Sequence, residues 1–204
     1  MRIAREGERK EEELDAIRLS PHQYVDVDLD KVFVQLLTDT KYGRETQNKP
    51  ADLKTFGQMV ATVFRVLSRE KLEAYQYTLA TLEELQNRGA RLFILSNAQR
   101  IFTQAEIELT GCATFMEKIY ISSDYRIKKP EPEFLLGLMG ENQLNPAETV
   151  FVGNDLTSDI AIAQAVGIDG VLLNTFPYSP DEIFAYQEKG WDFTIINDII
   201  ELIR

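Results

Sequence analysis

The alternation of helix-like and strand-like segments after residue 70 constrains the fold of this chain more than any other feature. Four short apolar segments are typical of buried strands, and a fifth is a candidate edge strand: Arg91–Leu95, Lys118–Ser122, Thr149–Val152, Gly170–Leu173 and Phe193–Ile196. Helical periodicity lies between and around them, at 72–85, 103–109, 133–139, 159–166 and 198–203. This order predicts βαβ units, and therefore an α/β fold with a doubly wound parallel sheet and helices on both faces.

The first 70 residues have a different pattern. Apolar residues recur at helical spacing around Leu14 and Ile17, from Val32 to Leu37 and from Leu53 to Leu67, and no buried strand is evident. A polar, turn-forming loop is expected at Tyr42–Pro50. We therefore predict a helical cap-like module at 1–70 and an α/β core at 71–204.

The composition of the chain argues against two classes of binding partner, nucleic acid and membrane surfaces. The net charge of -11 repels nucleic acid and anionic membrane surfaces, so neither is an expected partner. No apolar run approaches the roughly 18 to 20 residues of a membrane span. The single cysteine, Cys112, and the eleven charges among the first twenty residues favour a reducing, cytoplasmic location without a signal peptide. The oligomeric state is left open.

Polar residues follow three of the predicted strands directly. Ser96 and Asn97 follow the first, Lys129 comes shortly after the second, and Asp155 and Asp159 follow the third. In a parallel sheet these positions converge at the carboxyl ends of the strands, where such folds bind ligands. A hydroxyl, an amide, a lysine and two carboxylates could together hold a phosphoryl group and a hard divalent cation.

Each of these residues also has a purely structural interpretation. Ser96 and Asn97 could cap the next helix, and Lys129 could precede a helix that has proline in its first turn. Asp155 could cap the following helix, and Asp159 could interact with its dipole. Taken separately these interpretations are favoured, but they explain the joint spacing less well.

Three segments together resemble the haloacid dehalogenase-like hydrolase superfamily, from about Leu72 to the end of the chain. FILSN is similar to the second motif of that family, IKKPEPEFL to the third, and VFVGNDLTSDIAIAQAVG to the fourth. The order agrees, and Ser96 precedes Lys129 by 33 positions while Lys129 precedes Asp155 by 26. The resemblance implies a HAD-like, Rossmannoid core with a helical cap that shapes access to the site.

The resemblance also implies a role for each residue. Ser96 would hydrogen-bond the transferring phosphoryl group with support from Asn97, and Lys129 would stabilise its negative charge. Asp155 would ligate Mg2+, and Asp159 would complete the acidic site or orient Lys129. The implied function is a Mg2+-dependent phosphatase, a phosphoric monoester hydrolase acting on a small phosphorylated metabolite.

The nucleophile of this family is the part that the sequence does not supply clearly. Family chemistry requires an aspartate after an apolar strand and a second aspartate two positions later. Asp26 and Asp28 have this spacing, but no apolar strand precedes them and Asp30 stands where Thr or Val is expected. We favour a helix start at this point, with carboxylates near the N-terminus of a helix at 31–37.

If the first 70 residues are the cap, the nucleophile strand should precede Met1. In the family sheet that strand lies between the strands that end at Leu95 and Val152, so its loss would leave backbone groups to be paired or covered in another way. The alternative function is a catalytically silent HAD-fold domain that acts in binding or assembly. The position of Asp26 distinguishes the active phosphatase from the silent domain, because a shared charged site needs its carboxylate within about 4 to 6 Å of Asp155 and Lys129. A receiver-like phosphoacceptor is disfavoured, because no acidic pair follows an early strand.

Overall fold

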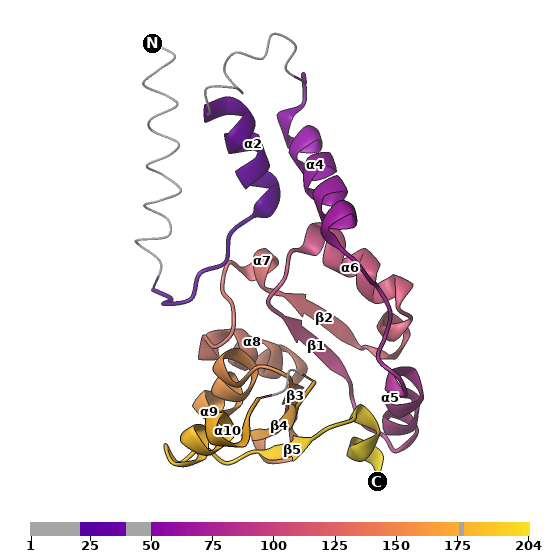
Figure 1. Cartoon of the computed structure of the whole chain (residues 1–204), viewed down its shortest axis with the longest axis vertical. Helices are drawn as coiled ribbons and strands as arrows, with labels where there is room; N and C mark the ends of the chain where they lie inside the picture. The colour runs from indigo at the N-terminus through magenta and orange to yellow at the C-terminus, as the bar shows by residue number, and fades with distance from the viewer. Residues whose placement is uncertain (1–20, 40–49, 176–177) are drawn as a thin grey trace.

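In the described part of the helical module, two helices pack closely together. The computed structural model describes residues 21–39, 50–175 and 178–204, so the predicted helix around Leu14 and Ile17 and most of the loop at 42–50 lie outside the described residues. Helix α2 (Leu29–Asp39) lies beside α4 (Leu53–Ser68) (Figure 1). The centroids of the Phe33 and Phe64 rings lie 5.7 Å apart. Gly57 permits this approach, because a Cβ there would lie 2.6 Å from Val34 Cγ2.

The remaining described residues alternate between strands and helices, as predicted. The strands are β1 (Phe93–Ser96), β2 (Lys118–Ile121), β3 (Val150–Gly153), β4 (Asp169–Leu173) and β5 (Thr194–Ile196). The α-helices are α5 (Thr78–Asn87), α6 (Arg100–Leu109), α7 (Ser122–Tyr125), α8 (Pro132–Asn142), α9 (Ala161–Val166) and α10 (Pro180–Gln187). Short η segments lie at Cys112–Phe115 (η1), Pro146–Glu148 (η2), Leu156–Ile160 (η3) and Ile199–Ile203 (η4).

Two predicted helices differ from the observed ones, one in where it begins and one in its type. The helix predicted at 72–85 begins only at Thr78, because Tyr77 adopts a left-handed φ of 66° that cannot continue a helix from Leu72. The last predicted helix, 198–203, is the 3-10 helix η4, which begins with a capping box between Asp198 and Glu201. Both differences concern local geometry and leave the order of elements unchanged.

The strands are parallel, as predicted, but they form two sheets where a single sheet was expected. One sheet contains β1 and β2, and the other has the order β3-β4-β5. Both sheets pack against α8 and α9 around one core, to which Leu95, Tyr120, Phe134, Leu138 and Ile162 belong and against which Phe151 packs. A second cluster, which includes Leu156, Leu172, Ile183 and Phe193, joins β4 to α10. The fold is therefore α/β with helices on both faces, and its parallel sheet is interrupted between β1 and β3.

Candidate active site

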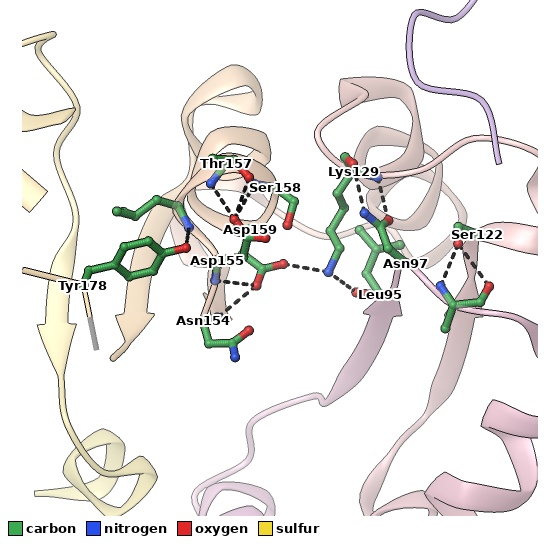
Figure 2. Close-up of polar contacts among 12 residues, drawn as sticks. Leu95, Asn97, Ser122, Lys129, Asn154, Asp155, Thr157, Ser158, Asp159 and Tyr178 are labelled. Atoms are coloured by element: carbon green, nitrogen blue, oxygen red, sulfur yellow. Dashed lines mark hydrogen bonds and ion pairs between the residues drawn. The ribbon is translucent and has the colours of Figure 1, made fainter. Parts of the chain in front are cut away.

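Lys129 lies at the carboxyl end of β1 and is held there by two acceptors. Its Nζ donates to the carbonyl oxygen of Leu95 at 2.8 Å and to Oδ1 of Asp159 at 2.7 Å (Figure 2). The side chains of Lys129 and Asp159 are only 10% and 8% exposed. A lysine placed in this way is a fixed positive charge at the rim of the sheet.

Both carboxylate oxygens of Asp159 accept hydrogen bonds in this arrangement. Its second oxygen, Oδ2, accepts from the backbone amides of Asn154 at 2.9 Å and Asp155 at 3.1 Å. Gly153 makes room for the carboxylate, because a Cβ at that position would overlap the Asp159 side chain. Of the two predicted roles for Asp159, completing the acidic site or orienting Lys129, this bonding favours the second.

Asn97 and Ser96 follow β1, and only Asn97 reaches Lys129. The Asn97 side chain accepts from the Lys129 amide at 2.7 Å and donates to its carbonyl at 3.0 Å, so it fixes the backbone of the lysine. Within the described residues, the hydroxyl of Ser96 makes no hydrogen bond. Neither residue caps α6, whose N-cap is Gln99.

Asp155 follows β3 and caps the next helical segment, which was its structural interpretation. Its Oδ1 accepts from the amide and hydroxyl of Thr157, both at 2.7 Å, and from the Ser158 amide at 3.3 Å. Burial raises the pKa of Asp155, but the hydrogen bonds from Thr157 and Ser158 outweigh it and hold that pKa below its usual value. The group is therefore a carboxylate at neutral pH, and its Oδ2 is the oxygen that a cation would take.

Asp26 lies in an extended segment before α2 and does not follow a strand of either sheet. Val25 forms an isolated antiparallel bridge with Ile127, and the Asp26 carboxylate accepts from the Ser122 hydroxyl at 2.5 Å. Helix α2 begins at Leu29, so the predicted helix start is confirmed. In the described part of the chain, no hydrogen bond or ion pair links Asp26 to Lys129 or Asp155.

A cavity of about 670 Å³ lies beside Lys129, between the helical module and the core. Its lining includes Asp26, Asn97, Thr157 and Ser158, together with Arg65 from α4. The sequence analysis did not identify Arg65, Ser122, Thr157 or Ser158 as site residues. Thr157 and Ser158 could have been found as the hydroxyls between the two aspartates of the fourth motif, whereas Arg65 and Ser122 carry no signal in the sequence.

The helical module is attached to the core by a cluster of charged side chains on α4 and α6. Glu106 accepts from Arg65 Nε at 2.8 Å and Nη2 at 3.0 Å, and from Arg69 Nη1 at 3.0 Å. The hydrogen bonds from Arg65 lower the pKa of Glu106 against the effect of burial, and Arg69 lowers it further. Gln99 adds a second link at the start of α2, where it donates to the Val27 carbonyl and accepts from the Leu29 amide.

His22, the only histidine of the chain, lies beside carboxylates at the start of α8. Its Nδ1 lies 3.6 Å from Oε1 of Glu131, and potential ligand atoms of His22, Glu131 and Glu133 lie within 4.8 Å of one another. Glu131 also accepts from the Tyr24 amide at 3.0 Å. These bonds join the segment before α2 to the start of α8, so the group has a structural role.

The fold and the rim residues define a class of protein. This class is the doubly wound α/β proteins, and here a lysine and an acidic pair lie at the carboxyl ends of the strands, where such folds bind ligands. The sequence profile described as haloacid dehalogenase-like hydrolase matches residues 20–173, so the chain belongs to that family. Among the residues that the structure describes, no helix is both long enough and apolar enough to cross a membrane.

Curated relatives carry phosphatase names. The chain is 27% identical over 131 residues to glyceraldehyde 3-phosphate phosphatase from Methanothermobacter thermautotrophicus, covering 64% of this chain and 58% of the relative. It is 29% identical over 126 residues to phosphoglycolate phosphatase from Salmonella typhi, covering 62% and 49%. The chain thus spans about half the length of these relatives.

Solved structures agree on the fold. A 2-haloacid dehalogenase from Pseudomonas syringae pv. Tomato superposes with a TM-score of 0.65 at 19% identity, over 86% of this chain and 70% of the other. A HAD phosphatase from Thermococcus onnurineus superposes with a TM-score of 0.54 at 20% identity, over 85% and 88%. At these identities the likeness concerns the fold alone.

Proposed function

We propose that this chain provides the phosphoryl-binding and cation-binding side of a Mg2+-dependent phosphatase site for a small phosphorylated metabolite. The observation that carries the proposal is the position of Lys129 Nζ, fixed by Leu95 and Asp159 beside a cavity at the carboxyl ends of the strands. The phosphatase names of the relatives support the same reaction class. The single cysteine supports a cytoplasmic location.

Lys129 would stabilise the negative charge that the phosphoryl oxygens carry in the transition state. Its ammonium is held in place before substrate binds, so little reorganisation is needed at the moment of reaction. Asn97 would fix the lysine backbone, and Ser96 would offer its hydroxyl to a phosphoryl oxygen. Asp159 would act as a positioning residue for Lys129.

The donors around Asp155 fit Mg2+. This cation takes oxygen ligands and is commonly bound by one or two carboxylates together with water and substrate phosphate. Asp155 is ionised at neutral pH and would present Oδ2, while the Thr157 and Ser158 amides hold Oδ1 in place. When bound there, Mg2+ would neutralise charge on the phosphoryl group.

The experiment measures hydrolysis of a generic phosphate ester by the purified chain, with Mg2+ and with EDTA. Asp155→Asn keeps the hydrogen-bonding shape of Asp155 but removes its charge, and we expect activity to fall at least ~100-fold, as for loss of a group that holds a charge-stabilising ion. Asp169→Asn, a carboxylate at the opposite end of β4, is the matched control and should keep full activity. A chain with no Mg2+-dependent turnover, or with unchanged turnover in Asp155→Asn, would contradict the proposal.

A second candidate function is a catalytically silent domain that binds a phosphorylated ligand or a partner. The bonding of Asp26 to Ser122 favours it, because Asp26 is the candidate nucleophile considered in the sequence and its carboxylate is held by that hydroxyl. Calorimetric titration with inorganic phosphate separates the candidates. Binding that Lys129→Met abolishes, in a chain without turnover, would identify the silent domain.

A further inference from the structure

The cavity beside Lys129 has a second group of lining residues, which the candidate phosphatase site does not use. Arg65 comes from α4, and Phe102 and Thr103 come from the first turn of α6, where the helical module is attached to the core (Figure 1). Pockets for small ligands usually have volumes of about 300–1,000 Å³. The cavity, at about 670 Å³, therefore has room for a ligand that extends beyond its phosphoryl group.

Arg65 is the cationic residue of this second group, and its guanidinium is held in one orientation. Glu106 accepts from Nε at 2.8 Å and from Nη2 at 3.0 Å, and the guanidinium carbon lies 5.2 Å from the centroid of the Phe102 ring. Glu106 does not line the cavity, so it fixes the guanidinium without filling the space beside it. Within the described residues, Nη1 of Arg65 makes no hydrogen bond, so its N–H groups remain available to a ligand.

Glu106 does not neutralise all of the positive charge around it. This single carboxylate faces two guanidinium groups, because Arg69 Nη1 also donates to it at 3.0 Å, and one positive charge is therefore in excess. Among the residues that line the cavity, the cationic ones outnumber the anionic one: Arg65, Lys128 and Lys129 against Asp26. In a chain of net charge -11, such a lining indicates an anionic ligand.

We propose that Arg65 binds a second anionic group of the substrate, a carboxylate or a further phosphoryl group, while Lys129 binds the phosphoryl group that is removed. The planar fork of a guanidinium matches both kinds of anion. The inference rests on the proposed function for the Lys129 end of the cavity, and it names the substrate class as small phosphorylated metabolites with a second negative charge. Arg65 is then a specificity-determining residue that does not touch the reacting atoms.

Phosphonates, which the chain cannot hydrolyse, test the proposal by isothermal titration calorimetry of the full chain with Mg2+. The charged ligands are 3-phosphonopropionate, 4-phosphonobutyrate and propane-1,3-diphosphonate. Propylphosphonate and butylphosphonate are the matched ligands, in which a methyl group replaces the second anion. We expect a charged ligand to bind about ten-fold more tightly than its matched ligand, a difference of about 1.4 kcal/mol. The comparison of the carboxylates with the diphosphonate shows which anion Arg65 takes.

Two matched variants test whether Arg65 is the residue responsible. Arg65→Gln and Arg69→Gln each remove one guanidinium from Glu106, but only Arg65 lines the cavity. Arg65→Gln should abolish the preference for the charged ligands, and Arg69→Gln should leave it unchanged. If Arg65→Gln does not fold, Arg65→Lys replaces it, because lysine keeps a charge facing Glu106 but lacks the planar fork, and it should weaken the preference.

The outcomes separate this inference from the proposed function. Lys129→Met should weaken charged and matched ligands by the same factor. Matched ligands that bind without any gain from a second anion would overturn the inference alone. Charged ligands that bind through Arg65, while the matched ligands do not bind, would support the inference and contradict the phosphoryl site at Lys129.

Two further results would count against the role of Arg65. Equal losses of preference in Arg65→Gln and Arg69→Gln would overturn it, because the cluster would then act only by holding the helical module in place. A chain that binds none of the phosphonates would overturn both the inference and the proposed function.

Discussion

Two carboxylates of the core, Asp159 and Glu106, bind cations that lie far from them in the sequence, and they do so in different ways. Asp159 holds one lysine and two backbone amides within the core, and both side chains of the ion pair are almost fully buried. Glu106 holds Arg65 of α4, which is 39% exposed, and Arg69, which directly follows that helix. The first arrangement fixes a charge at the rim, whereas the second holds two modules together at a surface that water reaches.

The difference matters because the free energy of an ion pair depends on its burial. Removing one partner of a buried pair leaves an uncompensated charge, whereas an exposed charge regains its hydration. Asp159 should therefore be essential for the core itself, and Glu106 for the attachment of the helical module. The predictions below test this ranking, from the largest expected effect to the smallest.

Asp159→Ala should have the largest effect. The substitution leaves Lys129 buried without its carboxylate and removes the acceptor of two backbone amides, so we expect a loss of about 3–5 kcal/mol in the free energy of unfolding. Urea denaturation at pH 7 measures this loss. Lys129→Met combined with Asp159→Leu should cost less than Asp159→Ala alone, and a larger cost would mean that the pair stabilises the fold by itself.

Gly153→Ala should have the second-largest effect on the free energy of unfolding. The added methyl group overlaps the Asp159 side chain, which Lys129 and two amides hold in place. We expect a loss of about 1–3 kcal/mol, the usual range for overpacking. The matched control is Gly137→Ala on α8, where nothing lies within 4 Å of the new Cβ and where alanine favours the helix. Equal effects of the two substitutions on the urea midpoint would show that Asp159 is not held tightly.

Residues that follow strands could be predicted as site residues from the sequence, whereas contacts between residues far apart along the chain could not. Lys129, Asp155 and Asp159 were found because residues after parallel strands share one rim, whatever the details of packing. Glu106 could not be found, because its partners lie 41 and 37 positions away on another module and are surface arginines by pattern. The bond between Asp26 and Ser122 spans 96 positions and follows no local rule.

Only the family resemblance indicated that a strand could be missing between β1 and β3, and the residues themselves predicted a single sheet. The periodicity of β1 and β3 predicts buried strands, and it contains no information on which strand pairs with which. Local departures from the helical pattern could not be predicted either. The left-handed conformation of Tyr77 delays the start of α5, although Leu72 and Tyr75 continue the helical pattern. Element order is thus readable from the sequence, while pairing and helix ends depend on tertiary structure.

Glu106→Gln should affect the attachment of the module more than the core. The amide keeps one acceptor oxygen but loses the charge that faces two guanidinium groups, and we expect a loss of about 1–2 kcal/mol. Hydrogen exchange should rise in α4 and α6 before it rises in β4. A uniform rise over the whole chain would contradict the separate role of this cluster.

The same residue should make stability depend on pH. The pKa of Glu106 is lowered in the folded state, so its contribution is present above the ordinary value of 4.5 and is lost as pH falls through the folded pKa. The difference in unfolding free energy between wild type and Glu106→Gln should therefore shrink as the pH falls from 6 towards 3. A difference that is constant over this range would show that Arg65 and Arg69 do not lower that pKa.

The smallest effect is expected for an ion pair whose two side chains are both exposed. Arg88 Nε lies 2.7 Å from Glu84 one turn earlier on α5, and the two side chains are 52% and 42% exposed. Glu84→Gln should cost no more than ~0.5 kcal/mol, and 0.5 M NaCl should remove most of this cost by screening. The Asp159 pair should respond much less to the same salt, because its charges are shielded from water. If salt weakened both pairs equally, burial would not be the property that separates them, and the ranking would have to rest on the number of hydrogen bonds instead.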